Sequence, residues 1–294
     1  MEASEKAPRI AKPSWLKVKL PTHKNFFKVS ELLNQKGVHT ICQSAKCPNI
    51  SKCWSEKTAT FLILGDICTR NCRFCAVKSG KPKPLSPNEP DQITGAVESM
   101  GLKYVVITSV TRDDLDDGGA SFFSQTVKKI KDKFPDVKIE VLIPDFKGSQ
   151  EALKKVFDSG PSVINHNLEV PYALYSSINR EPKNYYRSLK VLKNAKNMGA
   201  YAKSGIMVGL GEKYKHIIQT LKDLRSVSCD LLTIGQYLQA TKSNSPVKKY
   251  YSPDEFNYLK NKALNMDFNQ VESGPLVRSS FRAHHLYNRL IKTH

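Results

Sequence analysis

The sequence contains no run of about 18 apolar residues, the length that a helix needs to cross a bilayer, so a membrane-spanning helix is excluded. Acidic residues are also few, since 27 Asp and Glu stand against 46 Lys and Arg, which gives a formal net charge of +19. A field of this size favours an acidic partner, and nucleic acid is the first candidate on charge alone.

No export signal is visible at the start of the chain. Residues 1–15 carry mixed charge and include Glu2 and Glu5, which fits neither a secretory signal nor an Arg-rich transit peptide that lacks acidic residues. The sequence therefore favours a cytoplasmic location. Hydrophobic residues make up 40% of the chain and charged residues 25%, which excludes a disordered or low-complexity chain and predicts a globular protein.

From Thr58 onward, apolar runs of strand length alternate with segments that fit helices, a rhythm typical of βα units around a parallel sheet. The expected strands are Thr60 to Leu64, Tyr104 to Ser109, Ile139 to Ile143, Val163 to Leu168, Ala202 to Val208 and Leu231 to Tyr237. The expected helices are Glu89 to Met100, Ser121 to Phe134, Gln150 to Ser159, Tyr185 to Met198, Lys215 to Val227 and Pro253 to Leu264. Six units are too few for a closed eightfold barrel, so a partial barrel and an open doubly wound sheet both fit.

Cysteine is almost confined to one short segment: six of the seven lie between Cys42 and Cys75. An odd count, crowded in this way in a chain without an export signal, argues against a disulfide framework. Directly after the first expected strand, Cys68, Cys72 and Cys75 form a CX3CX2C loop. Three thiolates at this spacing can bind three irons of a 4Fe-4S cluster and leave the fourth iron open to another ligand. Structural zinc ordinarily takes four ligands in two separated pairs, so zinc is the weaker interpretation.

A second trio, Cys42-X4-Cys47-X5-Cys53, precedes that loop. Free cysteine packs as a small hydrophobe, so this trio could consist of buried, inert thiols. Beside the downstream triad, a second cluster is the favoured interpretation. Cys229 has no partner nearby in the sequence, and we expect a packed or free thiol there.

A CX3CX2C loop after the first of six βα units resembles the radical S-adenosylmethionine superfamily, and the added CX4CX5C motif resembles the lipoyl synthase family within it. The similarity spans Gly37 to Ala283 and includes the segments VITSVTRDDLDDGG from Val106, NHNLE from Asn165, KSGIMVGLGE from Lys203, GQYLQ from Gly235, YSPDEF from Tyr251 and GPLVRSS from Gly274. This resemblance implies a partial (βα)6 TIM-like barrel at residues 57–267. An N-terminal extension, residues 1–56, and a C-terminal extension, residues 268–294, are expected to cover it.

The resemblance also implies two 4Fe-4S clusters. One is expected on Cys68, Cys72 and Cys75, with its open iron binding S-adenosylmethionine, and the other on Cys42, Cys47, Cys53 and a serine of the run Arg278-Ser279-Ser280-Phe281. We assign the serine ligand to Ser280, with Ser279 as the alternative. The family usually has tyrosine at the position of Phe281; the ring is kept here, so we expect cluster ligation to survive.

The implied activity is radical insertion of two sulfur atoms, donated by the auxiliary cluster, at C6 and C8 of a protein-bound N6-octanoyl-lysine. The implied partners are octanoylated lipoyl domains of 2-oxoacid dehydrogenase E2 subunits and of the glycine cleavage H protein, with a ferredoxin or flavodoxin as electron donor. Neither nucleic acid nor a membrane is expected as a partner. Asn165 and Glu169, after the fourth expected strand, are candidates to bind the ribose hydroxyls of S-adenosylmethionine, the alternative being that they hold loop backbone.

The charged residues receive weaker assignments. Arg112 and the aspartates that follow it, up to Asp117, could form a charge network near the site, but a solvated loop is the favoured interpretation. His166 fits a satisfied core histidine. Five basic residues surround the cluster loop and could offset anionic iron-sulfur centres, namely Arg70, Arg73, Lys78, Lys81 and Lys83. The remaining basic surface could steer an acidic carrier domain toward the site.

Two other functions fit parts of the sequence. One is a different sulfur-inserting radical enzyme, similar to biotin synthase, against which the CX4CX5C trio and the Arg-Ser-Ser run speak. The other is a basic zinc protein that binds nucleic acid, which predicts CXXC pairs and a recognisable binding module and does not explain the βα rhythm.

Overall fold

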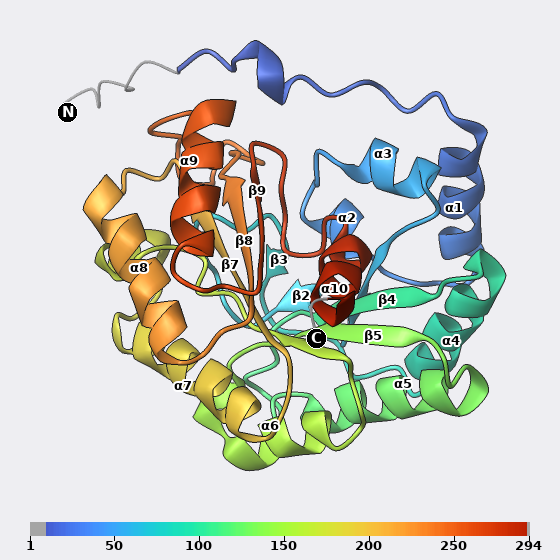
Figure 1. The fold of residues 1–294 in the computed structure, drawn as a ribbon. Coiled ribbons are helices and arrows are strands. Elements are labelled where there is room, and N and C mark those ends of the chain that lie inside the picture. The colour runs from blue at the N-terminus through green and yellow to red at the C-terminus, as the bar shows by residue number, and fades with distance from the viewer. Residues whose placement is uncertain (1–9, 293–294) are drawn as a thin grey trace, which may run out of the picture.

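A computed structural model describes residues 10–292 of the chain. Glu2, Glu5 and the outer ends of both expected extensions lie outside the described residues. The main sheet has seven strands, in the order β1-β4-β5-β6-β7-β8-β9, and every neighbouring pair is parallel (Figure 1). These strands are β1 (Thr60–Ile63), β4 (Tyr104–Ser109), β5 (Lys138–Leu142), β6 (Val163–Asn165), β7 (Ala202–Val208), β8 (Leu231–Gln236) and β9 (Gln270–Gly274). Two short strands, β2 (Ile67–Cys68) and β3 (Lys78–Ser79), pair separately in the cluster loop.

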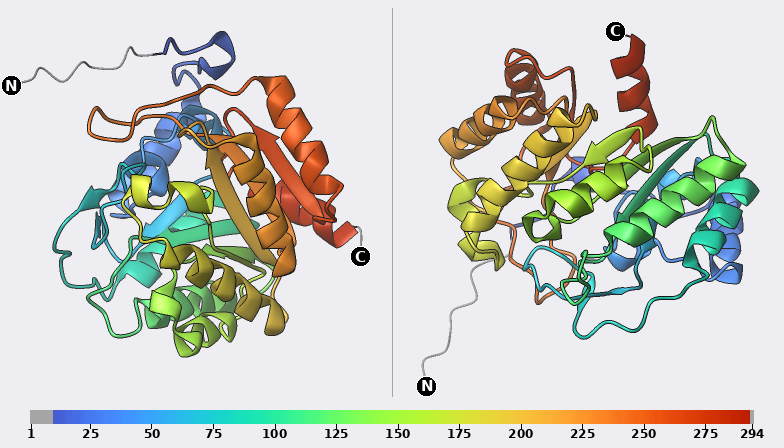
Figure 2. Two further views of the ribbon diagram at one scale, coloured as in Figure 1. Left: turned by 90° about the vertical axis from the view of Figure 1, so that its left-hand side faces the viewer. Right: turned by 90° about the horizontal axis from the view of Figure 1, so that it is seen from below.

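The strand order follows the chain order without reversal, whereas a doubly wound sheet reverses direction at a switch point. The expected partial barrel is therefore confirmed, and the doubly wound alternative is wrong. Helices cover the outer face of the sheet, as the views in Figure 2 show. They are α4 (Glu89–Met100), α5 (Ala120–Lys133), α6 (Gln150–Phe157), α7 (Lys183–Asn197), α8 (Tyr214–Ser226) and α9 (Pro253–Leu264), with 3-10 turns at Phe146–Gly148, Tyr172–Leu174 and Ser176–Ile178.

The hydrophobic core lies between this helical layer and the strands. Strands β1 and β8 are buried at every position, which explains why apolar residues predominate in their sequences. Local signals fix the helix ends. Helix α9 begins with a capping box between Ser252 and Glu255, and α4 ends at Gly101, whose φ of 63° favours glycine. Within residues 10–292, no helix is long and apolar enough to cross a membrane.

The seventh strand corrects the expected count of six. Strand β9 pairs with β8 in the register Leu231 with Gln270, although its residues fall in the segment expected to form the C-terminal extension. Its sequence, QVESG, mixes polar and apolar residues because it forms an edge of the sheet, where only Val271 and Gly274 are buried. A short strand without an apolar run gives no clear signal in the sequence.

The remaining helices precede and follow the barrel in the chain. Helices α1 (Lys24–Gln35), α2 (Ile41–Ser44) and α3 (Ile50–Ser55) follow a 3-10 turn at Ser14–Leu16. Helix α10 (Ala283–Lys292) packs Leu286, Tyr287 and Leu290 against Val163 and Leu231, which are the first residues of β6 and β8. Helix α10 therefore covers the amino-terminal ends of strands (Figure 1). The cavity described next lies at the opposite end of the barrel.

Candidate functional site

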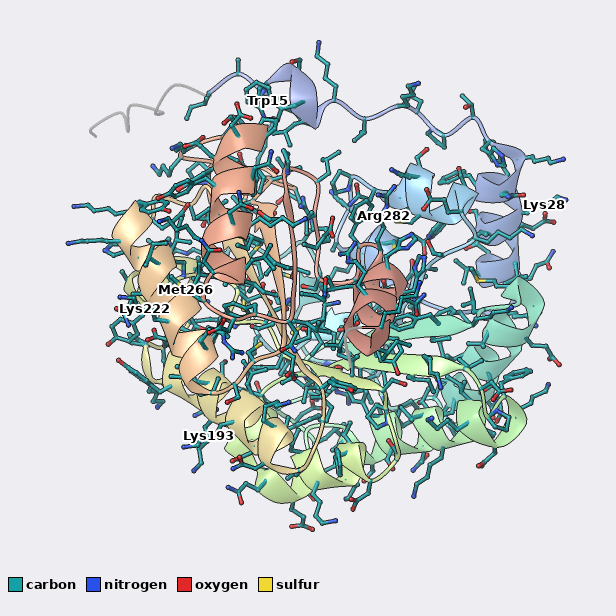
Figure 3. All side chains as sticks on the ribbon, in the orientation of Figure 1. Trp15, Lys28, Lys193, Lys222, Met266 and Arg282 are labelled. Carbon is teal, nitrogen blue, oxygen red and sulfur yellow. The ribbon has the colours of Figure 1, made fainter. Side chains whose placement is uncertain are left out.

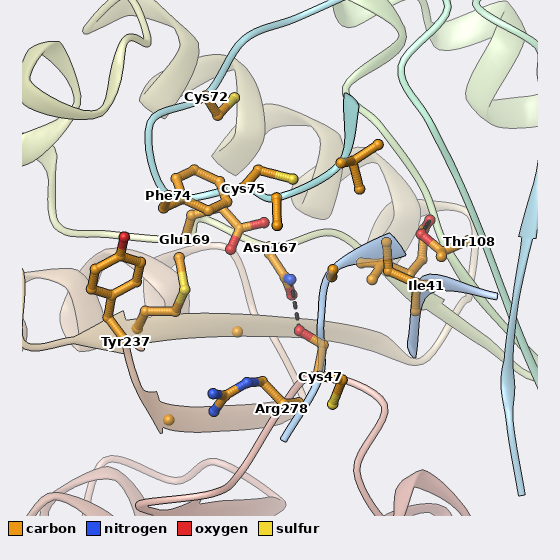
Figure 4. Close-up of a pocket in the computed structure, with 18 of the residues that line it drawn as sticks. Ile41, Cys47, Cys72, Phe74, Cys75, Thr108, Asn167, Glu169, Tyr237 and Arg278 are labelled. Atoms are coloured by element: carbon orange, nitrogen blue, oxygen red, sulfur yellow. Dashed lines mark hydrogen bonds between the residues drawn. The ribbon is translucent and has the colours of Figure 1, made fainter. Parts of the chain in front are cut away.

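A cavity of about 520 Å³ lies at the carboxyl ends of the strands. Its walls include Thr108, Leu142, Gly205 and Thr233 from β4, β5, β7 and β8. In parallel βα folds the loops at this end of the barrel build the active site, so the cavity is the candidate site. Figure 4 shows Cys72 and Cys75 on one side of it, Cys47 and Arg278 on the other, and Asn167 between them.

Hydrogen bonds fix the CX3CX2C loop on several sides. The Sγ of Cys68 accepts from the backbone N–H groups of Arg70 and Thr111, each at 3.4 Å. On the other side, Nδ2 of Asn244 donates to the carbonyl of Cys75 at 2.8 Å. N–H groups aimed at a ligand sulfur stabilise negative charge on it, and such contacts tune the potential of iron-sulfur clusters.

Arg70, inside the loop, is bound to two aspartates of the barrel. Its Nε and Nη2 donate to the two carboxylate oxygens of Asp113 at 2.7 and 2.9 Å, and Nη2 also donates to Asp145 at 2.7 Å. Burial alone would raise the pKa of Asp145, but the hydrogen bond and the charge of Arg70 hold it well below its ordinary value. Arg70 is therefore neutralised by carboxylates, contrary to the expectation that it offsets the cluster.

The cation next to the loop is the partly buried Arg180, which the sequence did not single out. Its Nε donates to the Sγ of Cys72 at 3.4 Å, and its guanidinium lies 5.4 Å from the ring centre of Phe74. Burial alone would lower the pKa of Arg180, but the negative charges of Cys72 and Glu169 raise it above its ordinary value. Lys78, Lys81 and Lys83, which the sequence placed around the loop, are exposed to solvent.

The second cysteine trio approaches the cavity from α2 and α3. Cys42 and Cys47 line the cavity together with Arg278, Ser279 and Ser280. Nδ2 of Asn49 donates to the carbonyl of Leu276 at 2.6 Å and so ties α3 to the segment after β9. The structure thus brings the CX4CX5C motif and the Arg-Ser-Ser run to one place, as the resemblance implied.

The donor groups fit two iron-sulfur clusters. Burial raises the pKa of Cys53 to about 12, with further increases from the charges of Cys42 and Cys47, so these three thiols lie close together. Burial likewise raises the pKa of Cys75 to about 12, with contributions from Cys72 and Cys68. All seven cysteines are free thiols.

A single metal ion does not fit these groups. Within residues 10–292, no three His, Cys, Asp or Glu side chains converge closely enough to share one ion. A four-iron cluster places each thiolate on a different iron.

The two residues expected at the ribose fall in different places. Glu169 lines the cavity with φ of 70°, and burial raises its pKa. Asn165 is fully buried below the cavity, where its Nδ2 donates to Glu140 at 2.8 Å, so the structure does not bring it to the expected site. Asn167, two residues further along, lines the cavity instead. Because alternate residues of an extended chain share a face, the NHNLE run carried the signal for Asn167 as well.

Most charged residues of the segment expected to be a solvated loop form hydrogen bonds within the protein. Arg112 is 3% exposed and binds Asp114 and the carbonyl of Leu64. Asp117 accepts hydrogen bonds from the backbone N–H groups of Gly119 and Ser121 at the start of α5. Asp116 is exposed and Asp114 is half-exposed, so these two residues fit the expected solvated loop. The expectation is wrong for Arg112, Asp113 and Asp117.

Two minor expectations are confirmed. His166 is buried, and its two ring nitrogens contact the carbonyl of Ile143 at 2.8 Å and the hydroxyl of Ser188 at 2.9 Å, as in a satisfied core histidine. Cys229 is fully buried, and its thiol lies 3.4 Å from the carbonyl of Leu231.

Comparisons with known proteins show which superfamily has this sequence pattern and this fold. Residues 62–224 match the model of the Radical SAM superfamily. Methylornithine synthase shares the fold at a TM-score of 0.53 and 14% identity, covering 92% of this chain and 93% of that one. A maturase of the iron-iron hydrogenase has the same TM-score at 13% identity, covering 92% and 74%. The chain is therefore a radical S-adenosylmethionine enzyme.

The family within this class is also defined. Residues 2–47 match the N-terminal domain of lipoyl synthase. The lipoyl synthase of Caldicellulosiruptor saccharolyticus is 51% identical over 92% of this chain and 96% of its own length. That of Rubrobacter xylanophilus is 48% identical over 94% and 86%. The chain belongs to the lipoyl synthase family.

Proposed function

We propose that this chain inserts two sulfur atoms at C6 and C8 of an octanoyl chain attached to a lysine of a lipoyl carrier domain. The observation that carries the proposal is the placement of cysteines from both motifs around one cavity, with Cys72 and Cys75 on one side and Cys47 on the other (Figure 4). A radical source and a sulfur source must both reach the same carbon atoms, and a shared cavity supplies that proximity.

We assign the residues as follows. Cys68, Cys72 and Cys75 hold the first 4Fe-4S cluster, and Cys42, Cys47, Cys53 and Ser280 hold the auxiliary one. When bound, the first cluster and S-adenosylmethionine supply the radical chemistry, and the auxiliary cluster supplies sulfur. Glu169 and Asn167 are placed to orient S-adenosylmethionine between the two trios.

The protein contributes placement and the exclusion of water. Apolar wall residues, including Leu142, Ile206 and Val277, suit an octanoyl chain, and the polar groups lie around them. We propose that the two extensions cover the barrel: α10 packs against the amino-terminal ends of strands, and α2 with the loop after it, up to Pro48, supplies a wall of the cavity. We propose residues 1–56, 57–267 and 268–294 as the three parts, with β9 completing the sheet.

We propose E2 subunits and the glycine cleavage H protein as carriers, a ferredoxin or flavodoxin as the electron donor and the cytoplasm as the location. Positive charge supports an acidic carrier. Lys28, Lys193 and Lys222 project outward from α1, α7 and α8 (Figure 3), so the charge is spread over several elements and acts at a distance. We expect the KM for the carrier domain to rise with ionic strength, because salt screens this attraction.

The decisive experiment supplies the reconstituted chain with S-adenosylmethionine, a reductant and an octanoylated lipoyl domain, and measures the mass of the domain. The expected result is the addition of two sulfur atoms. An otherwise identical reaction with the domain lacking the octanoyl group is the control and should leave its mass unchanged. No sulfur addition by a chain that retains both clusters and cleaves S-adenosylmethionine would refute the proposal.

A further inference from the structure

One hydrogen bond joins the serine-bearing segment to the barrel wall. Nδ2 of Asn167 donates to the hydroxyl of Ser279 at 2.6 Å, across 112 residues of sequence (Figure 4). Asn167 follows β6, and Ser279 follows β9, so the bond links two elements on different sides of the cavity.

A glycine in β7 makes room for this contact. A Cβ atom added at Gly205 would lie 2.6 Å from the hydroxyl of Thr233, 2.8 Å from Oδ1 of Asn167 and 3.0 Å from the hydroxyl of Ser279. Glycine weakens a strand interior and often marks the close approach of another group. Here three polar side chains meet directly above its Cα atom.

The residues before Ser279 are also held close to the sheet. A Cβ atom added at Gly235 of β8 would lie 2.2 Å from the carbonyl oxygen of Val277, and the carbonyl of Leu276 accepts from Asn49. The segment is thus fixed at successive positions up to Ser279. Ser280 follows and lines the cavity.

We propose that Ser279 is a positioning residue, whose hydrogen bond to Asn167 orients the segment so that Ser280 is the serine presented to Cys42, Cys47 and Cys53. The two serines then have different roles: Ser279 binds the barrel, and Ser280 binds iron. This inference rests on the proposed function, in which Ser280 holds one iron of the auxiliary cluster through its oxygen, and it adds the positioning role of Ser279.

The test compares the full-length reconstituted chain with Ser279→Ala, Ser279→Thr and Ser280→Ala variants, without carrier domain. The rate at which a chelator removes the first iron is measured, and Mössbauer spectra report the iron bound through oxygen. In Ser279→Ala we expect release to be roughly tenfold faster, the factor that corresponds to losing a hydrogen bond of ordinary net strength, about 1.4 kcal/mol. Ser280→Ala should lose the oxygen-bound signal altogether. Ser279→Thr keeps the hydroxyl and should behave like the unmodified chain.

Controls separate this role from general loosening. Ser226→Ala removes an exposed hydroxyl that bonds only to Asp223 within α8, and it should leave iron release unchanged. If Ser279→Ala does not fold, Asn167→Ala removes the donor from the other side and carries the same prediction for the auxiliary iron. Unchanged release in Ser279→Ala, or equal acceleration in Ser279→Thr, would overturn the proposal. So would a signal that depends on Ser279 and not on Ser280. Because no carrier is present, a failure of sulfur insertion would leave this result intact.

Discussion

Arg70 and Asp113 face each other in a two-pronged contact, with Nε donating to Oδ2 at 2.7 Å and Nη2 donating to Oδ1 at 2.9 Å. Arg70 lies between Cys68 and Cys72 in the chain, so the contact fastens the cluster loop to the loop after β4. Asp145, after β5, accepts from the same guanidinium. Three loops at the mouth of the barrel are therefore held by one side chain, and paired arginine contacts of this kind are the stronger and more directional ones.

Replacing Arg70 by Ala should loosen the first cluster. Asp145 is 3% exposed and would keep only Arg187, at 3.3 Å, as a cationic partner. We expect a loss of about 2 kcal/mol in the free energy of unfolding, below the range for a fully buried pair because Arg70 is partly exposed. Urea unfolding measures this loss, and iron content measures the cluster. Arg73→Ala is the matched control, since Arg73 is exposed and forms hydrogen bonds through its backbone N–H and carbonyl groups. Equal losses in both variants would contradict the role given to Arg70.

The same contact predicts a dependence of stability on pH. The pKa of Asp145 in the folded chain lies below the value of about 3.9 expected when unfolded, because Arg70 outweighs burial. A carboxylate of this kind stabilises the folded state above its unfolded pKa, and this stability is lost as the pH falls from about 5 toward the folded pKa. Urea unfolding between about pH 5 and pH 3 should therefore show a shallower decline in Asp145→Asn than in the unmodified chain. Parallel declines would show that other carboxylates dominate.

The arrangement of the barrel could be predicted because its signals are local. Strands β4 and β7 begin and end where the apolar runs do, and the CX3CX2C loop follows directly after the first strand. Strand β9 could not be predicted, because half of its side chains are polar and its burial depends on β8 and α9. Tertiary contacts decide such an edge strand.

The candidate site likewise contains some residues that could be predicted from the sequence and others that could not. The cysteines and the serine run could be assigned from their spacing. Arg180 could not, since it lies 108 residues from Cys72 and nothing in its local sequence distinguishes it from other arginines. Asn165 and Asn167 have the same side chain on the same face, and only depth in the barrel separates them: one bonds to Glu140 and the other reaches Ser279.

Arg180 should set the potential of the first cluster. Its positive charge contacts Cys72 in a partly buried setting, where solvent screens the charge less than at the open surface. Replacing Arg180 by Met removes this charge, and its removal favours the more oxidised cluster. The reduction potential should therefore fall by on the order of 60 mV, which corresponds to a tenfold change in the equilibrium constant for one electron. Redox titration followed by electron paramagnetic resonance measures the shift. Arg73→Met removes an exposed charge from the same loop and should change the potential little. A shift of equal size there would show that the effect is not specific to Arg180.

The two cysteine trios should separate two activities. The reconstituted chain should contain about eight irons, and Cys42→Ala and Cys68→Ala should each reduce this toward about four. Cys68→Ala should abolish the cleavage of S-adenosylmethionine. Cys42→Ala should largely keep that cleavage and lose sulfur transfer. Cys229→Ala, at the buried cysteine outside both trios, is the matched control and should keep both activities. Loss of both activities in Cys42→Ala with the first cluster intact would contradict the division.

The last prediction concerns an ion pair inside the barrel, between the cavity and α10. Nζ of Lys203 lies 2.8 and 3.0 Å from the two carboxylate oxygens of Glu140, and both side chains are 1% exposed. Tyr104 and Asn165 complete the hydrogen bonds of the carboxylate. Lys203→Met would leave a buried charge without its partner, so we expect the free energy of unfolding to fall by about 3–5 kcal/mol.

The double variant Glu140→Gln with Lys203→Met tests whether charge is the cause. It removes both charges and keeps an amide that can still bond to Tyr104 and Asn165, so it should recover most of the stability that Lys203→Met loses. Urea unfolding of the two single variants and the double variant measures the coupling. If the double variant is as unstable as Lys203→Met, the loss comes from the changed shape of the lysine site. Recovery together with normal iron content would show that the pair serves the barrel interior, because neither side chain lines the cavity.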